Sequence, residues 1–279
     1  MEVIRGELPA RRASMIYGQG GVGKTTFAAS FPEPLFIQGE QGSSQLENCA
    51  RFPVPETWSD VLVQVRSAPA TGCKTLVIDT LDGCERLLWQ EVCREGKAKS
   101  IETVGGGFGK GVARSAEKLK NELLPALDEC LAKGVAVLLL SHCVIKRHND
   151  PSGASYDRWA PAMAQAAWGA AYVWADNVLF AELEVVTSAE SEGGKAIVTG
   201  RRVLRTTQTG GFLAKNRRGM PPTIDMPKSD GYAALADYFR TYAELRAELN
   251  TLSPDARIAS VTDRDLLVQL IRKAKKNAK

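Results

Sequence analysis

A glycine-rich segment near the start of the chain carries the strongest chemical signal. It matches G-x-x-x-x-G-K-[ST] and consists of Gly18, Gln19, Gly20, Gly21, Val22, Gly23, Lys24 and Thr25, with Thr26 next. The glycines let successive backbone N–H groups turn inward and form a nest for an anion. Lys24 can then reach the β- and γ-phosphates of a nucleotide, and the Thr25 hydroxyl can ligate Mg²⁺. The segment therefore predicts a phosphate-binding loop.

Two acidic residues follow short apolar segments. Asp79 ends the apolar run of residues 75–79, and Glu40 comes shortly after residues 35–37. Ligands of open α/β sheets bind at the carboxyl ends of the strands. We expect Asp79 to hold the magnesium ion, the alternative being a helix N-cap. Glu40 is either the group that orients or deprotonates the attacking water or a solvated loop residue, and the pattern alone leaves both open.

A third polar strand end lies at Ser141-His142, after the apolar run of residues 135–141. If this strand joins the same sheet, His142 lies near the phosphates and can hydrogen-bond the γ-phosphate. The alternative is that His142 only ends the strand, because a single histidine is a weak signal.

The elements that must position these residues alternate along the chain. We expect strands at 13–17, 35–37, 75–79 and 135–141, and helices at 24–30, 57–67, 81–95 and 112–132. This alternation indicates an α/β fold with a mainly parallel sheet and helices on both faces.

The second half of the chain is expected to extend this core. Residues 177–187 and 195–207 predict a β-hairpin, and helices are expected at 231–249 and 262–276. Residues 96–111 and 144–160 are expected to be polar loops. We divide the chain into an ATPase-type core over residues 1–228 and a C-terminal helical extension with a basic tail over residues 229–279.

Composition excludes several classes of protein. The chain has 279 residues, 44% of them hydrophobic and 24% charged, with a net charge of +4. These values are ordinary for a globular protein and exclude collagen-like and wholly disordered chains. The longest apolar run, residues 135–140, is too short to span a bilayer. Without a C-x-x-C pair or an apolar signal segment, we expect a reduced, cytoplasmic protein with no membrane partner.

The order of these features resembles the RecA-type ATPase core. Phe36-Ile37-Gln38-Gly39-Glu40 resembles the strand that ends in that family's catalytic glutamate, and Leu76-Val77-Ile78-Asp79-Thr80 resembles its magnesium-binding strand end. His142 stands where the family usually has a glutamine. Ala214-Lys215-Asn216-Arg217 is similar to the basic element that a neighbouring subunit inserts into the ATP site.

The resemblance implies a RecA-like P-loop core that hydrolyses Mg-ATP between the subunits of a homo-oligomer, either a ring or a filament. Lys24 and Glu40 would act in one subunit, and Lys215 and Arg217 would come from its neighbour. Residues 107–111, 156–159 and 174–176 look more narrowly like the short RecA-core ATPases of phages, some of which anneal single strands. That likeness implies the cytoplasm of a bacterial host and a single-strand-binding protein as a further partner.

The two long loops stand where this family has its DNA-binding loops. Their cations and aromatic rings suit the phosphates and unpaired bases of single-stranded DNA. The candidate DNA-binding residues are Phe108, Lys110, Lys146, Arg147, Arg158 and Trp159. The alternative is a pair of ordinary polar loops, with Trp159 packed against the core. The basic end of the chain, residues 272–279, is either a DNA contact or a solvated tail.

The sequence therefore predicts an ATPase that binds single-stranded DNA and acts in recombination or annealing. The alternative is an ATP-switched assembly or loading protein of a replication or recombination complex, without direct DNA contact.

Overall fold

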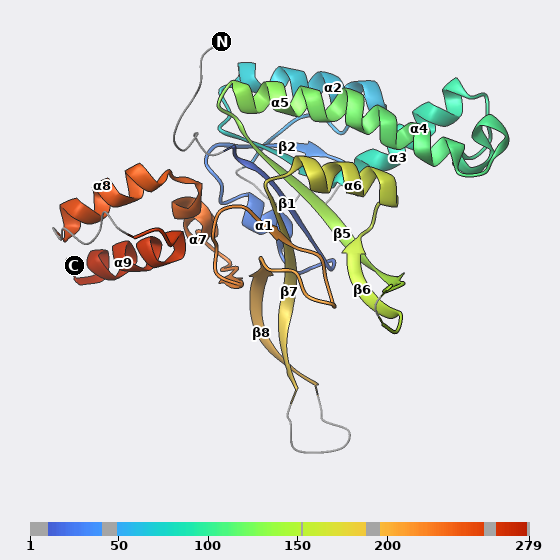
Figure 1. Cartoon of the computed structure of the whole chain (residues 1–279). Coiled ribbons are helices and arrows are strands. Elements are labelled where there is room, and N and C mark those ends of the chain that lie inside the picture. Colours follow the sequence, from blue (N-terminus) through green and yellow to red (C-terminus); the bar gives the residue numbers. More distant parts are fainter. Residues whose placement is uncertain (1–10, 41–48, 152, 188–195, 254–260, 278–279) are drawn as a thin grey trace, which may run out of the picture.

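The computed structural model describes residues 11–40, 49–151, 153–187, 196–253 and 261–277, which form a twisted sheet flanked by helices (Figure 1). The strands are β1 Ala13–Gly18, β2 Pro34–Gln38, β3 Ala50–Arg51, β4 Thr75–Asp79, β5 Ala136–His148, β6 Tyr156–Pro161, β7 Asn177–Thr187, β8 Ala196–Arg205, β9 Lys215–Asn216 and β10 Thr223–Asp225. The helices are α1 Lys24–Ala28, α2 Trp58–Ser67, α3 Leu81–Glu95, α4 Lys110–Lys118, α5 Leu124–Ala132, α6 Gln165–Trp174, α7 Ala233–Ala236, α8 Tyr242–Leu252 and α9 Arg264–Asn277.

The sheet has the order β10-β8-β7-β1-β5-β4-β2-β3. β1 lies at its centre and runs parallel to both β5 and β7, while β4 is parallel to β5 and β2. β7, β8 and β10 pair antiparallel, as the predicted hairpin requires. The predicted α/β class with a mainly parallel sheet is therefore confirmed.

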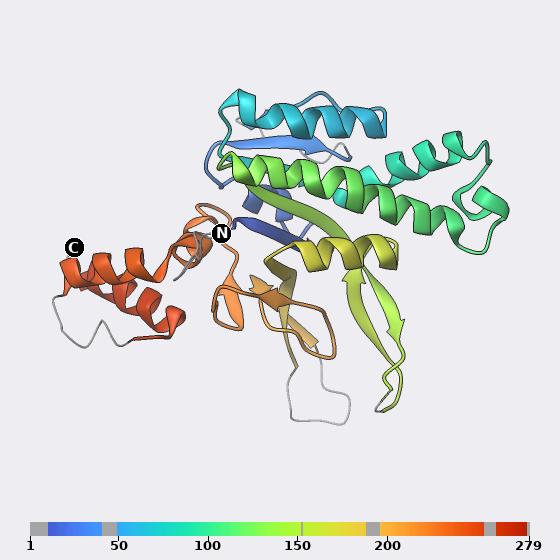
Figure 2. The ribbon, with the colours of Figure 1, turned by 45° about the horizontal axis from the view of Figure 1, so that its top comes forward.

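Both faces of the sheet are covered by apolar packing. On one face, Met15 and Tyr17 of β1 belong to a core that α2 to α6 complete, and on the other Ile16 packs with Phe27 of α1 and with α7 to α9. Figure 2 shows the long α4–α5 rod and α6 over the first face and the C-terminal helices set to one side. Strands buried on both faces read as continuous apolar runs, which explains why 75–79 and 135–141 were recognisable.

The carboxyl ends of the central strands meet at one edge. Gly18 of β1 pairs in register with His142 of β5, and Gln38 of β2 pairs with Asp79 of β4. The glycine-rich loop, the two acidic residues and His142 therefore converge, although up to about 120 residues of chain separate them.

The prediction of a loop at residues 144–160 is wrong. β5 continues through His148, turns, and returns as β6, with Lys146 opposite Arg158 and Ile145 opposite Trp159. Polar and apolar residues alternate along this segment, and such alternation is typical of a strand with one exposed face. Because polar residues dominate the segment, the sequence suggested a loop although the alternation is that of a strand.

The helix expected at 231–249 is also wrong in its extent. α7 ends early, and α8 starts anew after Thr241, whose hydroxyl accepts a hydrogen bond from the Glu244 backbone N–H while the Thr241 backbone N–H donates one to the Glu244 carboxylate. This capping box favours a fresh helix start at that point. Among the described residues, no helix combines the length and the apolar character needed to cross a membrane. The division of the chain at residue 228 stays a prediction.

Candidate active site

The glycine-rich loop joins the end of β1 to helix α1. Gly23 has φ 95° at the helix N-cap, a left-handed conformation that favours glycine. Lys24 follows and is only 6% exposed, and its Nζ donates hydrogen bonds of 2.9 Å to the carbonyl oxygens of Gly18 and Gln19. Burial lowers the pKa of Lys24. The Lys24 side chain therefore lies against the loop that is predicted to bind phosphate.

A cavity of about 330 Å³ lies beside this loop. It brings together most of the predicted phosphate, metal and catalytic residues; its lining is Gly21, Gly23, Lys24, Thr25, Thr26, Glu40, Asp79, Thr80 and His142. The cavity is predominantly polar and carries a lysine, two carboxylates and three threonines, which is a chemical set suited to a magnesium-bound phosphate chain.

Asp79 has the surroundings expected of a magnesium-binding carboxylate. It is 3% exposed, and its Oδ2 is buried without a hydrogen-bond partner in the described part of the protein. Burial raises its pKa, against a hydrogen bond from Thr25 that lowers it. An unsatisfied carboxylate oxygen beside a threonine hydroxyl fits Mg²⁺, a cation that prefers oxygen ligands and keeps several waters. The N-cap alternative for Asp79 is wrong, because Thr80 caps α3 through the Gly83 N–H.

His142 lies between two carboxylates. Its Nδ1 is 3.0 Å from Asp82 Oδ2, its Nε2 is 3.4 Å from Glu40 Oε1, and its backbone N–H donates to Asp82 Oδ1 at 3.0 Å. The hydrogen bond with Asp82 raises the pKa of His142. Burial opposes ionisation of Asp82, but the hydrogen bonds from the ring and backbone of His142 lower its pKa overall. Glu40 is thereby connected to α3 and β5 and is not an isolated loop residue.

Sequence reasoning missed Asp82. Its only signal was an acid in the first turn of the helix that follows Asp79, and such an acid is common because it favours the helix dipole. Only the approach of β5 to α3 shows that Asp82 holds His142.

The charge on His142 makes the stability of the fold depend on pH above the ordinary histidine pKa of about 6.5. Because the folded pKa is raised, its stabilising effect is complete below the unfolded value of about 6.5 and is lost as the pH rises through the folded value. Burial raises the pKa of Glu85 to about 7, so its contribution to stability is complete below its ordinary value of 4.5 and is lost as the pH rises to about 7. We expect the melting temperature of His142→Gln to fall less steeply than that of the wild type as the pH rises above about 6.5. Parallel melting profiles over this range would contradict the assignment.

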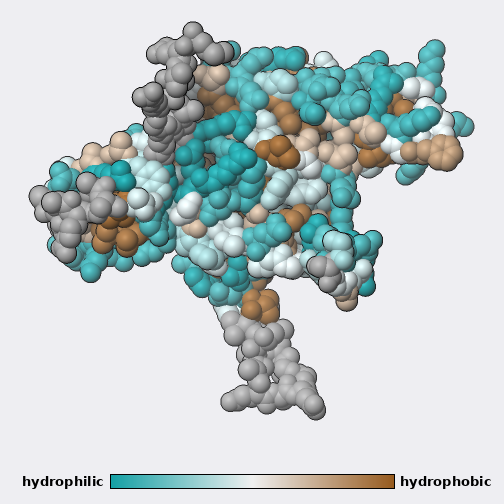
Figure 3. All heavy atoms as spheres, in the orientation of Figure 1, coloured by the Kyte–Doolittle hydropathy of each residue, from teal (hydrophilic) through white to brown (hydrophobic). Residues whose placement is uncertain are grey.

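Phe108 and Lys110 lie at the tip of a projecting helical hairpin. α3 runs outward beyond the sheet, the chain turns at residues 96–109, and α4 returns (Figure 1). Phe108 is 98% exposed, and Lys110 is exposed while its Nζ donates to the Gly105 carbonyl at 3.1 Å. Figure 3 shows a mostly hydrophilic face with a pale brown patch at this tip. An exposed aromatic ring among glycines and cations is available to a partner.

In the β5–β6 hairpin, some of the candidate DNA-binding side chains are exposed, and others are held by contacts within the protein. Arg147 is exposed and pairs with Asp157 at 3.4 Å, and Arg158 is half-buried. Lys146 donates its Nζ to the Met163 carbonyl at 2.7 Å, and Trp159 stacks on Phe180 with ring centroids 6.3 Å apart. Trp159 therefore packs against the core, the alternative that the sequence left open, and Lys146 is tied to the start of α6.

Lys215 and Arg217 lie away from the cavity of their own chain. The Lys215 Nζ donates to the carbonyls of Tyr172, Val173 and Ala175 at the end of α6, at 2.6–3.1 Å. Arg217 is 57% exposed and pairs with Asp176 at 3.2 Å. Lys215 thus caps a helix C-terminus, and Arg217 is the more accessible of the two cations. Their action in a neighbouring subunit stays a prediction.

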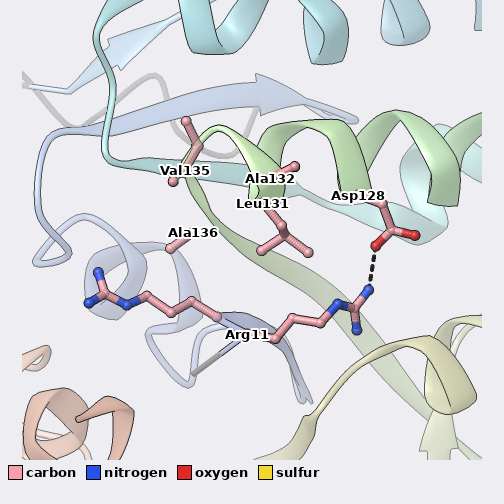
Figure 4. Close-up of a pocket in the computed structure, with 8 residues that line it drawn as sticks. Arg11, Asp128, Leu131, Ala132, Val135 and Ala136 are labelled. Carbon is pink, nitrogen blue, oxygen red and sulfur yellow. Dashed lines mark hydrogen bonds and ion pairs between the residues drawn. The ribbon is translucent and has the colours of Figure 1, made fainter. Parts of the chain in front are cut away.

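A hollow of about 530 Å³ lies at the opposite edge of the sheet, where β5 begins (Figure 4). Arg11 points from it toward Asp128, with which it forms an ion pair, and Leu131, Val135 and Ala136 line its apolar side. None of the phosphate-loop residues reaches this hollow, so its size alone does not make it the nucleotide site.

Three features together define a P-loop NTPase core. They are the mainly parallel sheet, the glycine loop with Lys24 and Thr25, and Asp79 on β4, which lies two strands away from β1 in the sheet. The family model of an AAA domain matches residues 10–218, and the chain therefore belongs to this AAA domain family. A search of curated proteins gave no match.

Proposed function

We propose that the protein is an ATPase of RecA-like type that binds single-stranded DNA and uses Mg-ATP to control that binding in recombination or annealing. The observation that supports it best is the single cavity that gathers Lys24, Thr25, Asp79, Glu40 and His142 at the end of β1. The AAA domain match supports the ATPase part of the proposal.

Each residue of the cavity has a role in this proposal. Lys24 leaves the loop carbonyls to neutralise phosphate charge, and Thr25 and Asp79 hold Mg²⁺, which supplies electrostatic stabilisation of the phosphate oxygens when bound. Glu40 accepts a proton from the attacking water. His142, held between Asp82 and Glu40, keeps Glu40 oriented and lies where loss of the γ-phosphate changes its surroundings.

The DNA part of the proposal depends on the two projections beyond the same edge of the sheet. The α3–α4 tip and the β5–β6 hairpin project to one side in both ribbon views (Figures 1 and 2). β5 runs continuously from His142 in the cavity to Lys146 and Arg147 in the hairpin. A change at His142 can therefore reach the hairpin along one strand, and ATP and ADP would then favour different DNA affinities.

Replacing Phe108 by alanine should weaken binding of a poly-dT strand by about 1–3 kcal/mol, because the exposed ring would no longer stack on a base. Fluorescence anisotropy with a non-hydrolysable ATP analogue measures the loss, and binding should be weaker with ADP and at higher salt. Trp159→Ala is the matched control: it should lower the melting temperature through lost contact with Phe180, with less effect on DNA affinity.

The same titration decides between the two candidate functions. If the wild-type protein with the ATP analogue binds no DNA at low salt, the DNA proposal fails. The nucleotide site would then serve an ATP-switched assembly or loading protein.

A further inference from the structure

The sheet order places the groups that are expected to act on the γ-phosphate on one side of β1. Asp79, His142 and Glu40 come from or follow β4, β5 and β2, all on one side of β1. The γ-phosphate must face these groups if they are to act on it. On the other side of β1 lie β7, β8 and β10, where the nucleoside end of such a molecule would have room to extend.

Arg202 of β8 lies against the phosphate loop from that other side. A Cβ placed on Gly23 would be 2.2 Å from its Nη1, so the guanidinium occupies the space that only a glycine leaves. Arg202 shares its face of β8 with Leu204, which packs in the same core as Phe27 of α1. The strand therefore directs Arg202 at the loop.

The guanidinium of Arg202 is incompletely satisfied within the protein. Its Nη2 is buried and has no hydrogen-bond partner among the described residues. A buried donor without a partner is unfavourable, and such groups in native proteins call for an explanation such as a ligand.

A hollow of about 390 Å³ lies beside Arg202, where β8 meets the end of β10. Gly200, Arg201 and Arg202 of β8 line it together with residues 225–228, which include the apolar Met226 and Pro227, and Arg201 forms an ion pair with Asp225 at 2.6 Å. Its volume is in the range of small-molecule sites, and its mixture of apolar and hydrogen-bonding groups suits a base and a ribose.

We propose that this hollow binds the nucleoside part of the nucleotide and that Arg202 is a nucleotide-binding residue, with its guanidinium donating to the ribose and base at the point where they leave the phosphate loop. The inference rests on the proposed ATP site and adds a second contact region to it. In this arrangement Lys24 holds the phosphates and Arg202 the nucleoside.

The test compares ATP with inorganic tripolyphosphate, which has the phosphate chain but no nucleoside. Arg202→Met keeps the apolar stem over Gly23 and removes the guanidinium. We expect it to weaken ATP binding about tenfold in calorimetry with Mg²⁺ and to change tripolyphosphate binding less than twofold. Its melting temperature without ligand should not fall, because the variant removes a buried unsatisfied donor. Arg205→Met is the control, since Arg205 pairs with Glu182 on the other face of β8.

Hydrogen exchange of the wild-type protein tests the same hollow without any variant. ATP should slow exchange at residues 225–228, and tripolyphosphate should not. Equal weakening of both ligands by Arg202→Met, unchanged ATP affinity, or equal protection by the two ligands would overturn the nucleoside site while leaving the ATPase proposal intact. A wild-type protein that binds neither ligand would overturn both.

Discussion

Replacing Arg217 by alanine should lower ATP turnover by a factor of about 10³–10⁵, the range of a cation supplied to the transition state of phosphoryl transfer. Arg217 is more than half exposed and lies outside the cavity of its own chain, so it can reach the site of a neighbour only in an assembly. ATP affinity of the isolated subunit should therefore stay nearly unchanged. A steady-state ATPase assay and a nucleotide titration measure the two quantities.

Mixed assemblies test whether Arg217 acts between subunits. Arg217→Ala subunits mixed with Lys24→Ala subunits should recover part of the activity, because some interfaces then combine an intact phosphate loop with an intact arginine. Absence of recovery in assemblies confirmed to be mixed counts against the neighbour role. Lys215→Ala provides the contrast: it should also lower the melting temperature, since its Nζ holds three carbonyls at the end of α6.

Glu40→Gln should bind ATP and hydrolyse it about 10²–10⁴ times more slowly, the usual contribution of a general base. The amide keeps the shape of the side chain and can still accept a hydrogen bond from His142, but it cannot take a proton from water. Turnover under saturating ATP and a separate binding titration distinguish these effects. Glu91→Gln, which removes a surface ion pair with Arg94 on α3, is the control. Wild-type turnover in Glu40→Gln would show that Glu40 is a loop residue without a catalytic role.

The parts of the site that lie within one short segment were predictable from sequence. The phosphate loop is a local motif whose glycines, lysine and threonine act together over eight positions. The apolar strands before Asp79 and His142 were visible as continuous runs, because a central parallel strand is buried on both faces. The parallel order of these strands then placed the carboxyl ends, and with them Asp79, Glu40 and His142, on one edge.

The tertiary structure decided which of several possible partners each residue has. Trp159 suits an exposed DNA contact or a core residue equally well by type, and only its stacking on Phe180 settles its packing. Neither Asp82 nor Arg202 lies in a recognisable sequence motif. Asp82 contacts His142 because α3 approaches β5, and Arg202 contacts the phosphate-binding loop because β8 approaches Gly23. A sequence pattern reports the periodic environment of a residue along its own element. It carries no information on which distant element packs there, because that contact depends on strand order and on side-chain packing across the whole sheet.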